Sequence, residues 1–207
     1  MSQPRYVPAG RVWFLSRSCT QRQYLLKPSK RANQAFLYAL AVAAQKTGVK
    51  ILWAVAMSNH QHCGVYDASG RMVEFTREFH RLVAKHHNAM YGRWENFWAC
   101  EPPTDILLSD ASDILDKLVY SLANPCSAHL VERARQWPGV ISLPNQLGRT
   151  MVIKRPKTYF REDGPMPPTV ELVFHKPPQF AHLSIEEYRA PEFATGTGGA
   201  RVTGRDS

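Results

Sequence analysis

Two histidines placed two residues apart are the side chains in this 207-residue sequence best suited to binding a metal ion. His60 and His62 lie in a short run typical of a β-strand, where alternate side chains project from one face, about 6.6 Å apart at the backbone. Imidazole binds several divalent metals, and two imidazoles leave coordination positions open for water or phosphate oxygens. The same spacing is also common on plain polar strand surfaces, so it does not identify a metal site by itself.

A tyrosine sixty residues further along has the position expected of a nucleophile rather than of a core residue. On a helical wheel, Tyr120 and Asn124 lie one turn apart on the polar side, opposite an apolar stripe made of Ile114, Leu115, Leu118, Val119 and Leu122. Lys117 lies one turn before Tyr120 on the same side and is placed to assist its deprotonation. Two alternatives stay open: Tyr120 as an ordinary surface aromatic, and Asn124 as the cap of a helix that begins at Pro125.

The elements that must position these residues are strands and helices in the order strand, helix, strand, strand, helix, strand, helix. Strands are expected over 11–20, 50–57 and 60–66, and helices over 29–45, 71–91 and 109–123. A pair of prolines limits 96–108 to an edge strand or a strand with a loop. Pro125 is expected to interrupt the helix and to start another that runs to about Arg135. This order predicts an α+β sandwich with helices packed on a mostly antiparallel sheet.

The chain changes character near residue 140, which predicts two parts. Residues 1–140 are expected to form the catalytic domain, and residues 141–207 a Pro-rich C-terminal extension with short strands at 150–154 and 170–175. The last stretch, 194–207, is rich in Gly and Thr and is expected to be a disordered tail.

The net charge of +9 is concentrated at the start of the chain. Residues 1–50 contain nine Lys and Arg and no Asp or Glu, a block that would attract a polyanion such as nucleic acid. A solubilising surface explains the charge equally well. Aromatic residues are interleaved with this block, as in proteins that bind single strands. The candidate DNA contacts are Arg11, Arg17, Arg22, Lys27, Lys30 and Arg31.

The sequence also predicts the cellular location of the protein and the role of its other histidines. With four scattered cysteines, no secretory leader and no apolar run of membrane-spanning length, we expect reduced thiols, a cytoplasmic location and no membrane partner. His80, His86 and His87 in the second helix, and His129 in the last one, are interpreted as helix surface.

Two segments resemble a known family. MSNHQHCGV (57–65) resembles the HxH strand of the HUH single-tyrosine transposases, and YSLANPCSAHLV (120–131) followed by QWP (136–138) is similar to the signature of REP-associated tyrosine transposases. The resemblance covers roughly residues 8–140. The usual middle residue of the histidine triplet is a hydrophobe, and Gln61 departs from it by placing a polar group on the face that packs inward.

The resemblance implies a ferredoxin-like domain that cleaves and rejoins single-stranded DNA through a 5′-phosphotyrosyl intermediate, on hairpin-flanked sites in the bacterial cytoplasm, associated with the nucleoid while it acts. Tyr120 matches the nucleophile, His60 and His62 match the metal ligands, and Asn124 matches the place of a third ligand. The implied cofactor is a divalent metal ion, Mg²⁺ or Mn²⁺, and the implied assembly is a monomer or homodimer.

Two other functions compete with this one. The first is a catalytically inactive module that binds hairpin DNA and derives from such a transposase. Gln61 and the Pro-rich extension make it possible, whereas the presence of Tyr120, His60 and His62 argues against it. The second is a zinc or HNH-type hydrolase that uses Asn59, His60 and His62, for which the sequence offers no convincing further ligands.

Overall fold

The fold is a four-stranded antiparallel sheet with helices on both faces, as the computed structural model describes it for residues 7–157, 161 and 163–189. The strand order is β2-β3-β1-β4, and every neighbouring pair is antiparallel. This is the ferredoxin-like α+β sandwich that the sequence predicts. The strands are β1 (Arg11–Ser18), β2 (Lys50–Ala56), β3 (His60–Asp67) and β4 (Thr104–Leu108), and the helices are α1 (Lys30–Thr47), α2 (Met72–Tyr91), α3 (Ala111–Ser127) and α4 (Ile185–Tyr188).

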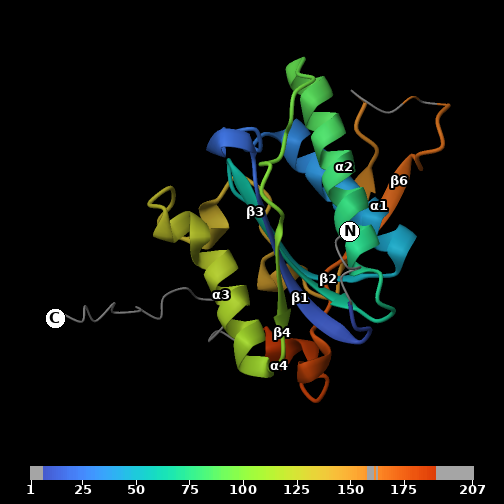
Figure 1. Cartoon of the computed structure of the whole chain (residues 1–207). Helices are drawn as coiled ribbons and strands as arrows, with labels where there is room; N and C mark the ends of the chain where they lie inside the picture. Colours follow the sequence, from blue (N-terminus) through green and yellow to red (C-terminus); the bar gives the residue numbers. More distant parts are fainter. Residues whose placement is uncertain (1–6, 158–160, 162, 190–207) are drawn as a thin grey trace.

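The two faces of the sheet are covered by different helices (Figure 1). Gln61 of β3 contacts His80 of α2, whereas the next residue, His62, contacts Asn124 of α3. Successive side chains of a strand point to opposite faces, so α2 lies on one face and α3 on the other. Helix α1 packs beside α2, where the rings of Phe36 and Phe79 meet edge-on at 5.1 Å.

Local signals fix the ends of the helices as the sequence predicts. The Ser29 hydroxyl accepts a hydrogen bond from the backbone N–H of Ala32 at the start of α1, and Gly48 ends that helix with a φ of 73°. Gly92 ends α2 in the same left-handed conformation, with a φ of 63°. Because these signals depend only on neighbouring residues, they are readable without the tertiary structure.

The expected break at Pro125 is wrong. Helix α3 continues through Pro125 to Ser127, and the separate helix predicted to run to about Arg135 is absent from the described residues, which have only a 3-10 turn at Ala134–Gln136 there. Pro125 lies in the last turn, where the lost N–H costs the helix a single hydrogen bond. Burial of its ring against the rest of the molecule favours the continued helix.

Residues after 139 cover the outer edge of β2. Val140 accepts a hydrogen bond from Ala56 N–H at 2.8 Å, and Ser142 N–H donates to the Ala54 carbonyl at 2.9 Å. The predicted strands of the extension are present as β5 (Thr150–Lys154) and β6 (Thr169–Val173), which pair with each other and contact α1. Their inward residues belong to the same apolar cluster as the main sheet.

The division into domains at residue 140 stays a prediction. The expected disordered tail, 194–207, lies outside the described residues. Within the described part, no helix combines the length and apolar character that crossing a membrane requires.

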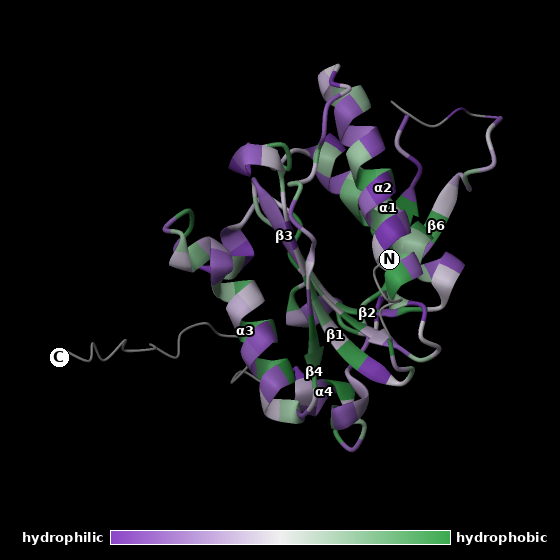
Figure 2. Cartoon of the chain, viewed as in Figure 1, coloured by the Kyte–Doolittle hydropathy of each residue, from purple (hydrophilic) through white to green (hydrophobic). Residues whose placement is uncertain are grey.

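The hydrophobic colouring follows this arrangement (Figure 2). Hydrophobic residues concentrate on the central part of the sheet, while β3 begins in a hydrophilic stretch. Trp13 and Phe14, adjacent in β1, are both buried because the sheet is covered on both faces. The hydrophilic start of β3 holds the two histidines.

Gly64 leaves the space that the largest buried side chain occupies. Trp53 of β2 lies opposite Gly64 of β3, next to a register shift in β2, and its indole passes directly over the glycine. A Cβ atom at residue 64 would lie 2.3 Å from the ring carbons of Trp53. Residue 64 therefore has to be glycine, without a side chain, for the Trp53 indole to remain in place.

We predict that Gly64→Ala lowers the free energy of unfolding by about 1–3 kcal/mol or more, because the added methyl group displaces a buried indole. Urea unfolding followed by tryptophan fluorescence measures the change. Gly92→Ala is the control: its Cβ would meet nothing within 4 Å, so only the cost of a left-handed residue, about 1 kcal/mol, is expected. Equal losses in the two variants would contradict the steric explanation.

Candidate functional site

The two histidines lie side by side at the start of β3, facing α3. Their ring centres are 4.8 Å apart, and His62 is only 4% exposed. Phe14 of the neighbouring strand stacks on His62, with ring centres 5.4 Å apart and 21° between the planes. The expectation that both rings share one face is confirmed, and the stacked Phe14 restricts the orientation of one of them.

Burial keeps both imidazoles neutral, and hydrogen bonding selects the tautomer of His60. Nδ1 of His60 lies 2.7 Å from the amide oxygen of Asn59, which can only accept, so Nδ1 carries the proton and Nε2 keeps its lone pair. Burial is the main cause that lowers the pKa of His60, with a smaller contribution from the charge of Arg22. Burial, His60 and Lys117 together lower the pKa of His62 to about 3. Neutral imidazoles are the form that binds metals.

Asn124 joins the histidines from the opposite side of the site. Its amide nitrogen lies 3.3 Å from Nε2 of His62, and its side chain also hydrogen-bonds to His60. Because α3 continues past this residue, the alternative interpretation of Asn124 as a helix cap is wrong.

The helix is rotated relative to the predicted wheel. Its fully buried residues are Ile114, Ser121 and Pro125, whereas Val119, assigned to the apolar stripe, is 50% exposed. The apolar stripe is therefore turned partly away from the sheet. Ser121 takes a buried position instead, because its hydroxyl bonds to a buried partner on the sheet. This rotation turns Asn124 toward the histidines.

Tyr120 lies at the edge of the site and is half exposed. Its ring is 5.4 Å from His62 and 6.4 Å from Phe14, edge-on to both, and 53% of the residue is accessible. The ammonium of Lys117 lies 5.6 Å from the centre of the Tyr120 ring. The structure therefore brings together Tyr120, His60, His62 and Asn124, and adds a cation beside the phenol.

A buried hydrogen bond between Trp53 and Ser121 holds α3 at this distance from the sheet. Trp53 Nε1–H donates to the Ser121 hydroxyl at 3.0 Å, and that hydroxyl donates to the Lys117 carbonyl at 2.6 Å. Sequence reasoning did not identify either residue as part of the site. The available signal was a lone serine, one residue after Tyr120, on the inner side of the helix.

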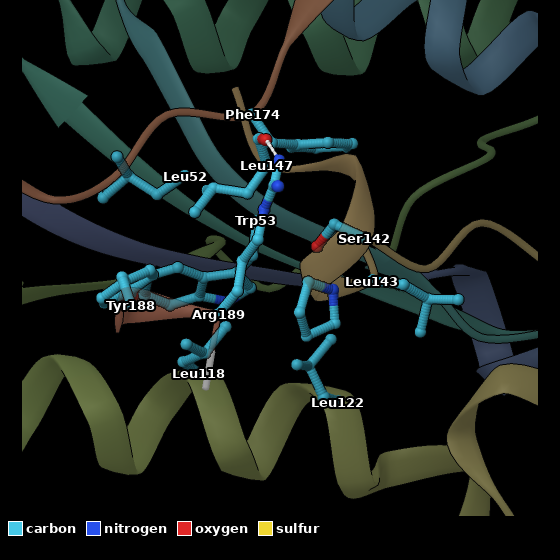
Figure 3. Close-up of a pocket in the computed structure, with 11 residues that line it drawn as sticks. Leu52, Trp53, Leu118, Leu122, Ser142, Leu143, Leu147, Phe174, Tyr188 and Arg189 are labelled. Carbon is cyan, nitrogen blue, oxygen red and sulfur yellow. Dashed lines mark hydrogen bonds between the residues drawn. The ribbon is translucent and has the colours of Figure 1, made fainter. Parts of the chain in front are cut away.

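The cavity next to Trp53 is too small for a nucleotide. It has a volume of about 40 Å³ and lies between β2, α3 and the C-terminal residues, with Leu118 and Leu122 closing it from the helix (Figure 3). It is a packing defect beneath α3 and offers no substrate site.

The donor set at the site fits a divalent metal ion. His62 turns its Nε2 toward the amide of Asn124, and the side chain of Asn124 also contacts His60, whose Nδ1 is occupied by Asn59. In the described part of the chain, no group of three or more His, Cys, Asp or Glu side chains could hold a metal. Any ion bound here would thus be held by two imidazoles and an amide, with positions left for water or phosphate.

The other histidines of the second helix are not on its surface, contrary to the prediction. His80, His86 and His87 are at most 2% exposed. The reason is tertiary: the segment after α2 folds back over the helix, where Phe97 packs on His87 and Trp98 packs on His80. His129 is exposed but follows α3 instead of lying in it, with a φ of 55°.

The predicted DNA contacts are spread over the sheet and its edge. Arg22 is exposed near His60, and Lys27, Lys30 and Arg31 are exposed on the adjoining turn and the start of α1. Arg11 is exposed at the opposite end of β1, seven residues from the Ser18 that pairs with His60. The remaining candidate, Arg17, is half-buried and hydrogen-bonds to His80.

Known proteins resemble this chain in structure but not detectably in sequence. No family model matches the chain, and no curated protein matches it. A solved structure of a REP-associated tyrosine transposase bound to a REP hairpin matches with a TM-score of 0.54 and 20% identity, covering 67% of this chain and 81% of the other. A putative transposase from Deinococcus radiodurans matches with a TM-score of 0.40 and 14% identity, covering 60% and 97%. At 20% identity, the first match establishes a shared fold.

We predict that Ser121→Ala lowers the free energy of unfolding by about 1–3 kcal/mol, because it leaves the buried indole N–H of Trp53 without an acceptor. Urea denaturation measures the loss. Ser127→Ala, at the exposed end of the same helix, is the matched control and should change stability by no more than about 0.5 kcal/mol. Similar values for the two variants would mean that the Trp53–Ser121 bond does not stabilise the docked helix.

Proposed function

We propose that this protein is a metal-dependent transposase that cleaves and rejoins single-stranded DNA through a 5′-phosphotyrosyl intermediate on Tyr120. The observation that carries the proposal is the meeting of an exposed tyrosine with two neutral imidazoles and an amide on one face of the sheet. The fold shared with a transposase supports it.

Tyr120 would attack the scissile phosphate. The phenol loses its proton to water and its oxygen forms a bond to phosphorus, the bond from phosphorus to the 3′ oxygen breaks, and the 3′ oxygen takes up a proton from water. A tyrosine hydroxyl is a weak nucleophile at neutral pH and needs help to lose its proton. The ammonium of Lys117 lies beside the ring, where its charge stabilises the developing phenolate. Attack by a 3′ hydroxyl on the phosphotyrosyl bond reverses these changes and rejoins the strand.

His60, His62 and Asn124 would hold the metal ion. When bound, Mg²⁺ or Mn²⁺ supplies Lewis acidity at the scissile phosphate. The side chain of Asn59 accepts a hydrogen bond from Nδ1–H of His60 and so leaves the lone pair on Nε2. Phe14 and α3 contact His62 from two sides. Imidazole ligands favour Mn²⁺ over the harder Mg²⁺.

The substrate that we propose is single-stranded DNA flanked by a hairpin. The transposase with the shared fold is bound to a REP hairpin, and the basic residues near the site provide phosphate contacts for such a ligand. Three of these residues are exposed around the turn nearest His60, namely Arg22, Lys27 and Lys30. They are closer to the site than Arg11 and so are better placed to contact DNA phosphates. We propose a bacterial cytoplasmic location and a monomer or homodimer.

The alternative is an inactive module that binds hairpin DNA. Gln61 makes it possible, but the buried amide of Gln61 has a partner in His80, so the polar residue is accommodated in the sheet. A module of this kind would bind DNA and form no covalent adduct, whereas the transposase forms one.

We predict that the wild-type protein forms a covalent adduct with labelled single-stranded hairpin DNA and that Tyr120→Phe does not, because phenylalanine has no nucleophilic oxygen. A denaturing gel detects the adduct. Stability and DNA affinity should stay within about 0.5 kcal/mol, since the residue is half exposed. Tyr91→Phe, at a residue that is 41% exposed, is the control and should keep the adduct. An adduct that survives Tyr120→Phe and disappears in Tyr91→Phe would refute the assignment.

We also predict that His60→Ala and His62→Ala abolish cleavage while most DNA affinity remains. The metal acts on charge that develops in the transition state, whereas affinity comes from many phosphate contacts. Cleavage rates measured with EDTA, Mg²⁺ and Mn²⁺ test this, and Mn²⁺ should give the fastest rate. His129→Ala, at an exposed histidine outside the site, is the control. Full activity in EDTA would exclude the metal.

A further inference from the structure

A polar hollow of about 370 Å³ lies one strand away from the histidines. β1 runs beside β3, with Ser18 opposite His60 and Ser16 opposite His62. On its other side β1 pairs with β4 only as far as Ser16, and contact resumes where Ala99 N–H donates to the Ser18 carbonyl. Glu101 and Pro102, in the unpaired stretch between these points, line the hollow.

We propose that this hollow binds one unpaired nucleotide of the DNA strand, adjacent to the phosphate that Tyr120 attacks. The proposal rests on the proposed function and deepens it by assigning a site for the nucleotide. The volume falls within the range of about 300–1,000 Å³ that is typical of small-molecule sites, so it accepts a single nucleotide but not a duplex.

A cation held in place forms one wall. Arg17 Nη1 lies 3.1 Å from Nδ1 of His80, and its guanidinium carbon is 5.5 Å from the centre of the Trp98 ring. Its Nε–H is buried without a hydrogen-bond partner. Burial lowers the pKa of Arg17, and the carboxylate of Asp105 nearby opposes that shift. A guanidinium already fixed by a histidine and an indole loses little freedom when it binds a phosphate.

A second cation is held at the rim in an unfavourable backbone conformation. Gln21 and Arg22 are consecutive non-glycine residues with φ of 48° and 55°, in the left-handed region. Such strain persists only where the surroundings enforce it, and it is concentrated at functional sites. The turn holds Arg22 on the hollow while its charge still reaches His60. A phosphate on Arg22 would therefore lie between the hollow and the histidines.

The remaining walls carry groups that distinguish bases. Ser16, Ser18, Thr104 and Glu101 line the hollow. Serine and threonine hydroxyls donate or accept, and a carboxylate only accepts. A carboxylate pairs with the exocyclic amino group of cytosine and repels the carbonyl that thymine has at that position. The structure thus assigns the hollow a preference for cytosine over thymine.

The test uses the full-length protein and four probes: dCMP, dTMP, dAMP and inorganic phosphate. The side-chain Nε–H of Arg17 and the indole N–H of Trp98 are followed in ¹H–¹⁵N spectra, with the arginine signal assigned by its loss in Arg17→Lys. We expect dCMP to shift both signals and to bind more tightly than dTMP. No shift with any nucleotide would overturn the proposal, and shifts of equal size with inorganic phosphate would reduce the hollow to an anion site and overturn its nucleotide assignment.

Two surface variants avoid disturbing the buried network. Arg22→Gln should weaken dCMP binding about ten- to a hundred-fold, the range expected for one charge-assisted hydrogen bond. Glu101→Gln should reduce the preference for dCMP over dTMP without weakening phosphate binding. Arg77→Gln, at an exposed arginine of α2, is the control for loss of charge. If Arg22→Gln matches Arg77→Gln, the hollow is not the binding site.

These readouts need no cleavage, so they separate this proposal from the proposed function. Absence of a covalent adduct in the wild-type protein with normal dCMP shifts would overturn the transposase function but leave a nucleotide site. An adduct that forms normally while all nucleotide shifts are absent would overturn the hollow alone.

Discussion

The contact between α3 and the sheet depends on one buried hydrogen bond between an indole and a serine. Trp53 can reach Ser121 because the strand beneath its ring has no side chain at Gly64. Tyr120 precedes Ser121 directly, and Asn124 follows it by three residues, so the same bond sets the distance of both from the histidines. Tyr120 itself is half exposed. The buried Ser121 next to it in the chain provides the restraint that keeps it beside His62.

The period of two along β3 divides the polar groups between the two layers of helices. His60 and His62 face α3, while Gln61 faces α2 and reaches His80. The face toward α3 is half open at Tyr120, whereas the face toward α2 is closed by Trp98. A short polar stretch can therefore place a reactive group in contact with solvent on one side and complete a buried hydrogen-bond network on the other.

How far the sequence predicts this structure depends on the range of the interactions involved. Ser29, Gly48 and Gly92 act on their own neighbours, and the helix ends they mark are predicted correctly. The period of two places His60 and His62 on one face for the same reason. Pro125 and Val119 were misjudged because the contacts of α3 with the sheet outweigh local preference. His80 was misjudged because the segment that buries it lies eighteen residues further along, at Trp98.

Gln61 illustrates why a departure from a pattern has to be judged against its partners. Arg17 can only donate, so Nδ1 of His80 accepts and Nε2 carries the proton. The amide of Gln61 lies 3.2 Å from that Nε2, and a half-turn of the amide presents its oxygen as the acceptor. A hydrophobic residue at position 61 would leave the buried N–H of His80 without an acceptor, at a cost of about 1–3 kcal/mol. The polar residue in the histidine triplet is thus explained by the arginine directly opposite it on β1, and this explanation requires no loss of activity at the histidines on either side.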